Sequence, residues 1–69
     1  MYKVVYTKNG EKHVATTVQT LKQAKTVLES TERVHRQDVN CVDCVTLLQR
    51  FISYFADGSV YDYSIKRVR

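Results

Sequence analysis

Two cysteines, Cys41 and Cys44, form the one metal-like or redox-like spacing in the chain. A structural zinc site needs four ligands, and the usual second pair of ligands is missing. A thioredoxin-like role would need the motif at the start of a helix within a βαβ unit, and the surrounding sequence lacks that context. On a regular strand, residues three apart point to opposite faces, so the thiols are not expected to converge. We therefore interpret both cysteines as small apolar strand residues and expect no metal and no cofactor.

Histidines and acidic residues are the other groups that could support catalysis. His13 follows a turn and is predicted to lie on the sheet surface beside Tyr6, while His35 ends a predicted helix, where a cation meets the negative end of the macrodipole. No serine sits in a nucleophile elbow, and no glycine-rich loop can hold a phosphate. We predict that the chain is not an enzyme. The aspartates are scattered among turns and strands rather than paired on one predicted element: Asp38, Asp43, Asp57 and Asp62.

The strands are rich in tyrosine. A sheet covered by one helix needs only one apolar face, so tyrosines on the second face would form an exposed aromatic patch, which commonly marks a binding surface. The alternative is that the rings brace exposed strands by cross-strand pairing. Both interpretations stay open at this point. The tyrosines concerned are Tyr6, Tyr54, Tyr61 and Tyr63.

The formal net charge of +4 favours an anionic partner, either nucleic acid or an acidic protein surface. With tyrosines, such cations can follow a nucleic-acid backbone while bases stack on the rings, although the RNA-binding signature of the RRM is missing. Each group of cations by itself is more typical of a solvated edge. The groups are Lys22, Lys25, Arg33 and Arg36 on or after the helix; Lys3, Lys8 and Lys12 on the first hairpin; and Lys66, Arg67 and Arg69 near the end. The candidate partner-binding residues are therefore Lys22, Lys25, Arg33, Arg36, Tyr6, Tyr54, Tyr61 and Tyr63.

Local sequence signals predict the elements that position these residues. Asn9-Gly10 separates two strand-like runs, Tyr2–Lys8 and Glu11–Val18, and Asn-Gly is typical of a type I′ hairpin turn. The register then sets Val5 opposite Val14, Tyr6 opposite His13 and Val4 opposite Ala15.

A helix is predicted from about Leu21 to His35. Thr20 and Gln23 form a capping box in which each side chain satisfies a free amide at the helix start. Ala24 and Leu28 belong to the apolar positions that then recur at helical spacing.

The segment from Cys41 to Phe55 fits either a helix or two strands separated near Leu48-Gln49. Its density of β-branched and aromatic residues favours strands. Asp57-Gly58 then precedes Val60–Ile65 and gives a second hairpin signal. The predicted fold is α+β, with a single helix packed on an antiparallel sheet in the order β-β-α-β-β-β. Phe51 and Phe55 are expected on one side of the last strands and Ile52 and Tyr54 on the other.

Length and composition limit the organisation of the chain. Its 69 residues fit one domain spanning 1–69, with stability near the margin. No segment approaches the roughly 20 apolar residues that cross a bilayer, and the N-terminus lacks the features of a signal peptide. Two cysteines are too few to staple a secreted mini-protein. We therefore expect a cytoplasmic protein.

Several pieces of the chain together resemble a known family. They are the tyrosine-rich opening strand, the helix start Thr20-Leu21-Lys22-Gln23-Ala24-Lys25, the strand Val42–Val45, and Tyr54-Phe55-Ala56-Asp57-Gly58. In this order they are similar to the small phage-encoded anti-CRISPR proteins that inhibit type I-F surveillance complexes. The family's basic helix surface matches here only at Lys25, because Thr26 and Ser30 are neutral.

This resemblance implies a non-enzymatic viral inhibitor in the host cytoplasm that docks on Cas backbone subunits and keeps target DNA from binding. Three hypotheses follow. The first is a phage inhibitor that uses the basic helix face and adjoining strands against a host protein or ribonucleoprotein complex. The second is a nucleic-acid-binding module, and the third is an accessory subunit that self-associates through its open sheet face. The chain is expected to be a monomer or weak homodimer without membrane contact.

Overall fold

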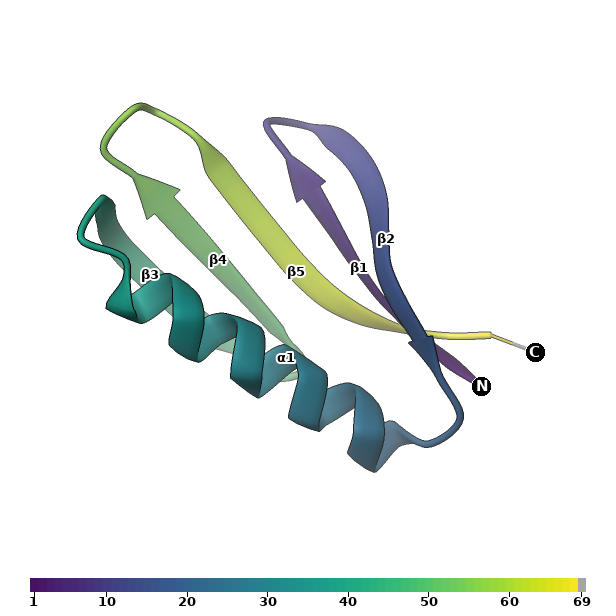
Figure 1. The fold of residues 1–69 in the computed structure, drawn as a ribbon. Coiled ribbons are helices and arrows are strands. Elements are labelled where there is room, and N and C mark those ends of the chain that lie inside the picture. The colour runs from purple at the N-terminus through teal and green to yellow at the C-terminus, as the bar shows by residue number, and fades with distance from the viewer. Residues whose placement is uncertain (69) are drawn as a thin grey trace.

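The computed structural model describes residues 1–68 and contains one helix packed on one five-stranded antiparallel sheet (Figure 1). The strand order is β2-β1-β5-β4-β3, so the first and last strands of the chain lie side by side in the middle. This arrangement confirms the predicted α+β class. Within residues 1–68 no helix has the length and apolar character that crossing a bilayer requires. The elements are β1 (Tyr2–Lys8), β2 (Glu11–Val18), α1 (Leu21–Gln37), β3 (Cys41–Leu47), β4 (Arg50–Phe55) and β5 (Val60–Arg67).

The first hairpin turns at Asn9 and Gly10, whose φ angles of 52° and 87° are the positive values that a type I′ turn requires. The Asn9 side chain also accepts a hydrogen bond from the backbone N–H of Val60 at 2.8 Å. The turn is therefore held against the start of β5 as well as between its own strands.

The expected register of this hairpin is right near the turn and wrong beyond it. Val5 pairs with Val14 and Tyr6 with His13, but Val4 lies opposite Thr16 rather than Ala15. Ala15 is the extra residue of a β-bulge, which reverses the alternation of the strand. Because of that reversal, Val18 packs against the core below the helix.

The helix begins as predicted. Thr20 Oγ1 accepts a hydrogen bond from the Gln23 N–H, and Gln23 Oε1 accepts one from the Thr20 N–H, both at 3.1 Å. The helix continues to Gln37 rather than ending near His35. Its buried residues, Ala24 and Leu28, pack on a core formed with Val4, Phe51 and Tyr63.

The segment after the helix forms strands, as its composition favours. β3 and β4 are joined by a tight turn at Leu48-Gln49, and Leu47 pairs with Arg50 across it. Phe51 and Phe55 lie on the helix side of β4, and Ile52 and Tyr54 lie on the far side, as expected from the alternation.

One face of the sheet carries the helix and the opposite face carries none (Figure 1). We call this uncovered surface the open face. Strand register and alternation assign its members: Lys3, Val5 and Thr7 of β1; Lys12, Val14 and Thr17 of β2; Asp43, Val45 and Leu47 of β3; Arg50, Ile52 and Tyr54 of β4; and Val60, Asp62, Ser64 and Lys66 of β5.

Candidate binding surface

Most of the candidate tyrosines lie on the helix side of the sheet and not on the open face. Tyr63 is only 8% exposed, and its ring stacks between those of Phe51 at 4.9 Å and Tyr6 at 4.7 Å. His13 extends this stack from Tyr6 at 5.0 Å, so four rings cross β4, β5, β1 and β2 in succession. These rings pair across neighbouring strands, as in the second of the two interpretations made from the sequence, but they do so under the helix and not on exposed strands.

Tyr61 and Tyr54 differ in their surroundings. Tyr61 follows the alternation of Tyr63, and its ring lies 5.3 Å from that of Phe55 on the helix side, with Lys8 Nζ 5.7 Å from its centroid. Tyr54 is the one candidate tyrosine on the open face and is 40% exposed. An aromatic platform built from all four rings therefore does not exist on either surface.

The cations of the helix fall into two groups. Lys22, Lys25 and Arg33 are exposed on α1. Arg36 instead ties the helix to β3, because Nε donates to Glu32 Oε2 at 2.9 Å and Nη2 donates to Thr46 Oγ1 at 2.7 Å. Arg36 therefore has a structural role, unlike the other three candidates.

Arg36 also covers part of the exposed edge of β3. Its Nη2 donates to the carbonyl oxygen of Cys44 at 3.3 Å, and the N–H of Cys44 donates to Asp43 Oδ1 at 2.8 Å. Both backbone groups of Cys44 thus bond to side chains rather than to a further strand. Charged groups placed in this way protect an edge strand from pairing with a second chain.

The expectation for the two cysteines is wrong in its geometry. Val42 is the extra residue of a bulge in β3, so Cys41 lies opposite Phe55 and Cys44 lies opposite Ser53. Both thiols consequently lie on the helix side of the strand. Burial raises the pKa of the Cys41 thiol, and the neighbouring Cys44 raises it further. Within residues 1–68 no group of three or more His, Cys, Asp or Glu residues is arranged to hold a metal ion.

His35 is turned inward toward β4. Its Nδ1 lies 2.9 Å from Oγ of the fully buried Ser53. Burial lowers the pKa of His35, and the charge of Asp38 opposes that effect only in part. Burial therefore favours the neutral imidazole and works against the stabilising cation expected at this position. The ring makes edge-on contacts with Phe51, Phe55, Tyr61 and Tyr63.

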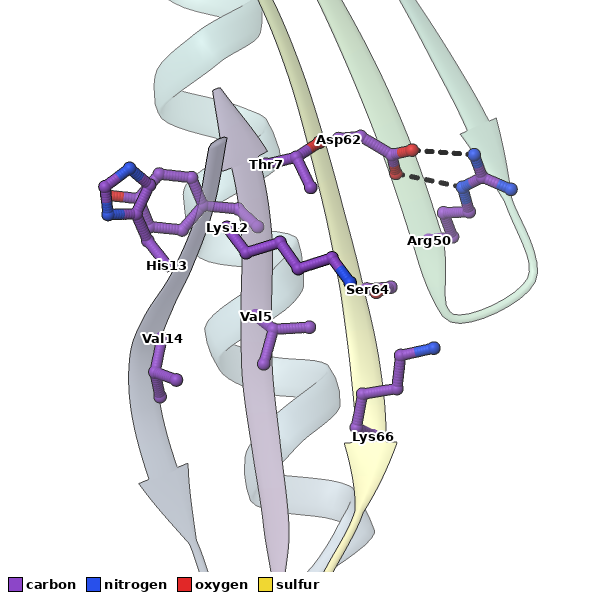
Figure 2. Close-up of a pocket in the computed structure, with 10 residues that line it drawn as sticks. Val5, Thr7, Lys12, His13, Val14, Arg50, Asp62, Ser64 and Lys66 are labelled. Carbon is purple, nitrogen blue, oxygen red and sulfur yellow. Dashed lines mark hydrogen bonds and ion pairs between the residues drawn. The ribbon is translucent and has the colours of Figure 1, made fainter. Parts of the chain in front are cut away.

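The open face contains a hollow of about 620 Å³ that the sequence did not reveal (Figure 2). We call it the basic hollow, and define it by Lys12, Arg50 and Lys66 around Val5 and Ser64. In Figure 2 the Lys12 side chain crosses β1 and brings its amino group beside Ser64, and Lys66 reaches over the same surface.

Arg50 already binds one carboxylate in this hollow. Its Nε donates to Asp62 Oδ1 at 2.9 Å, and its Nη2 donates to Asp62 Oδ2 at 2.7 Å. The paired guanidinium and carboxylate form one wall of the hollow, and both lysines lie beyond it (Figure 2). The hollow as a whole remains positively charged.

Apolar side chains cover the other half of the open face. We call this half the apolar strip and define it by Val45, Leu47, Ile52 and Tyr54, which come from the adjacent strands β3 and β4. Val45 is 39% and Leu47 is 49% exposed. Contiguous apolar surface left uncovered in a soluble domain commonly marks an interaction site.

The sequence held a signal for the basic hollow in its strand alternation. Val5 lies opposite both Val14 and Ser64, and Ser64 lies opposite Arg50, so one row crosses the sheet. The missing information was the strand order, which brings together residues from the first hairpin and from the end of the chain. Arg69, the last of the cations named in the sequence analysis, lies outside the described residues.

The chain matches no protein-family model, no curated protein and no solved structure at a significant level. A function for this chain is therefore argued from the chemistry of the open face.

Proposed function

We propose that this chain is a non-enzymatic inhibitor that docks through its open face on a host nucleoprotein complex and blocks the binding of target nucleic acid. One observation carries the proposal: a whole sheet face is uncovered and combines the basic hollow with the apolar strip. Protein interfaces are built from an apolar centre with polar and charged groups at its rim.

A protein partner uses both halves of this face. A nucleic-acid backbone would contact the cations but leave the apolar side chains Val45, Leu47 and Ile52 without a role. Single-stranded nucleic acid would also need rings on which bases stack. Tyr6 and Tyr63 stack on other rings on the helix side, so Tyr54 is the one candidate tyrosine that the open face offers.

The identity of the target rests on the resemblance to anti-CRISPR proteins. The similar pieces are the opening strand, the capped helix start and the strands that follow it, in the element order β-β-α-β-β-β. A type I-F surveillance complex is accordingly the first complex to test. Its Cas backbone subunits would offer the docking surface.

The test measures binding of a labelled target duplex to the purified surveillance complex. An excess of the wild-type chain should abolish duplex binding. Val45→Lys, which places a charge in the apolar strip, should lose the inhibition, whereas Ser30→Lys adds the same charge to the helix and should retain it. Unchanged duplex binding in the presence of excess wild-type chain would contradict the proposal.

A second candidate function is direct nucleic-acid binding. It is favoured by the three cations that line the basic hollow. Affinity for an oligonucleotide should then fall steeply as salt is added, because bound phosphates release counterions. Absence of binding even at low salt would exclude this function.

A further inference from the structure

We infer that the basic hollow receives a carboxylate side chain from an acidic protein segment whose apolar side chains pack on the adjoining apolar strip. This inference rests on the proposed function and names the chemistry of the partner at that site. The hollow joins three cations from three strands over a floor that includes Val5 and Val14.

The two lysines of the hollow are available for an incoming anion. The ion pairs found among residues 1–68 involve Arg50, Arg36 and His13, and neither Lys12 nor Lys66 takes part in them. Lys66 also lies directly opposite Lys3 in the β1–β5 register. Like charges in such cross-strand positions are destabilising, so an anion bound beside them relieves a repulsion.

A carboxylate suits the hollow better than a row of phosphates. Asp62 already places one negative charge in the wall, paired with Arg50 at 2.7 Å. A nucleic-acid strand brings a negative charge with every nucleotide, so continuing along the face it would meet Asp62. A protein segment can place one carboxylate near Lys12 and Lys66 and neutral side chains elsewhere.

The strand register connects the hollow to the apolar strip. The row Val14, Val5, Ser64, Arg50 and Leu47 runs straight across the sheet from β2 to β3. Neighbouring strands are about 4.8 Å apart, so Ser64 on β5 and Leu47 on β3 are separated by roughly 10 Å. A few residues of one extended segment cover that distance, and a carboxylate and an apolar side chain of the same segment can therefore occupy both halves.

The inference is tested by NMR titration of the isotope-labelled chain with poly-L-glutamate as the carboxylate probe. Signals of Val5, Val14, Ser64 and Lys66 should shift, and those around Lys22 and Lys25 on the exposed helix should not. The double substitution Lys12→Glu/Lys66→Glu should weaken binding at least about tenfold, which corresponds to about 1.4 kcal/mol. Circular dichroism of the variant checks that it is folded.

Shifts centred on the helix, or spread equally over both surfaces, would overturn the inference because they indicate unspecific attraction to a basic protein. A parallel titration uses a single-stranded oligonucleotide of similar charge. If the oligonucleotide binds at Val5 and Ser64 more tightly than poly-L-glutamate does, the hollow is a nucleic-acid site and the inference is also overturned.

The outcome is separable from that of the proposed function. If poly-L-glutamate binds at the hollow while the surveillance complex still binds its duplex, the site stands and the proposed target is wrong. If the duplex is displaced while the hollow shows no response to poly-L-glutamate, the proposed function stands and this inference fails.

Discussion

The two faces of the sheet are built from alternate residues of the same strands and have different chemistry. Under the helix, Val4 and Phe51 are fully buried, and four rings stack across four strands. On the open face, Val14 and Leu47 remain about half exposed. A domain this small buries a limited share of its surface, and its single helix covers only one face. The proposed binding role rests on the apolar residues that remain uncovered on the other face.

The largest expected effect is the difference in stability lost when an apolar residue is substituted on each of the two faces. Phe51→Ala should destabilise the fold by about 3–5 kcal/mol because it leaves a cavity in the core. Leu47→Thr, which removes an apolar side chain from the open face, should change stability by less than about 0.5 kcal/mol. Urea unfolding followed by circular dichroism measures both. Similar losses for the two variants would show that the open face is covered in the free protein.

Two serines give a smaller and closely matched comparison. Ser53 is fully buried and its Oγ lies 2.9 Å from His35 Nδ1, whereas Ser64 lies on the open face. Ser53→Ala should destabilise the protein by about 1–3 kcal/mol, because it removes the partner of a half-buried imidazole. Ser64→Ala should have almost no effect on the midpoint of urea unfolding. Equal effects would contradict the distinction between the faces.

The pH dependence of stability tests the environment of His35. Its pKa in the folded state lies below the ordinary value of 6.5, so the stabilisation from neutral His35 is present above that pH. It should be lost as the pH falls from 6.5 through the folded-state pKa. Thermal unfolding between neutral and mildly acidic pH should show this decline in the wild type and in His13→Gln. A decline that persists unchanged in His35→Gln would show that another group is responsible.

The smallest effect concerns the edge of β3. Arg36→Ala removes the hydrogen bond to the carbonyl oxygen of Cys44 and leaves Thr46 bonded only to Glu32, so the edge should begin to self-associate weakly. Arg33→Ala is the control, since it removes the same charge from the exposed part of α1. Sedimentation over a concentration range should show a rising mass for Arg36→Ala alone. A rising mass for the wild type would mean that the edge is not protected.

Local signals predicted most of the fold. Asn9-Gly10 and the capping box at Thr20 act within a few residues, so their outcome can be inferred without knowing the rest of the chain. The bulges at Ala15 and Val42 could not be inferred in this way. Each bulge reverses the alternation of its strand, and its position depends on which side chains the helix covers. That information comes from packing between elements and not from a few neighbouring residues.

The candidate binding surface was harder to predict than the fold. The tyrosines were placed on the second face as one of two alternatives, but Tyr6 and Tyr63 pack on the helix side. The basic hollow depends on the strand order, which sets Lys12 and Lys66 on either side of β1. The sequence favoured the helix as the binding surface because its cations are close together in the chain.

A matched pair of charge reversals tests the central claim that the open face, and not the helix, is the docking surface. Lys12→Glu/Lys66→Glu and Lys22→Glu/Lys25→Glu lower the net charge by the same amount on opposite sides of the molecule. The measurement is the affinity of each variant for poly-L-glutamate at one fixed salt concentration. The account predicts at least about a tenfold loss for the first variant and less than about a twofold loss for the second. Equal losses, or a larger loss for the helix variant, would contradict it.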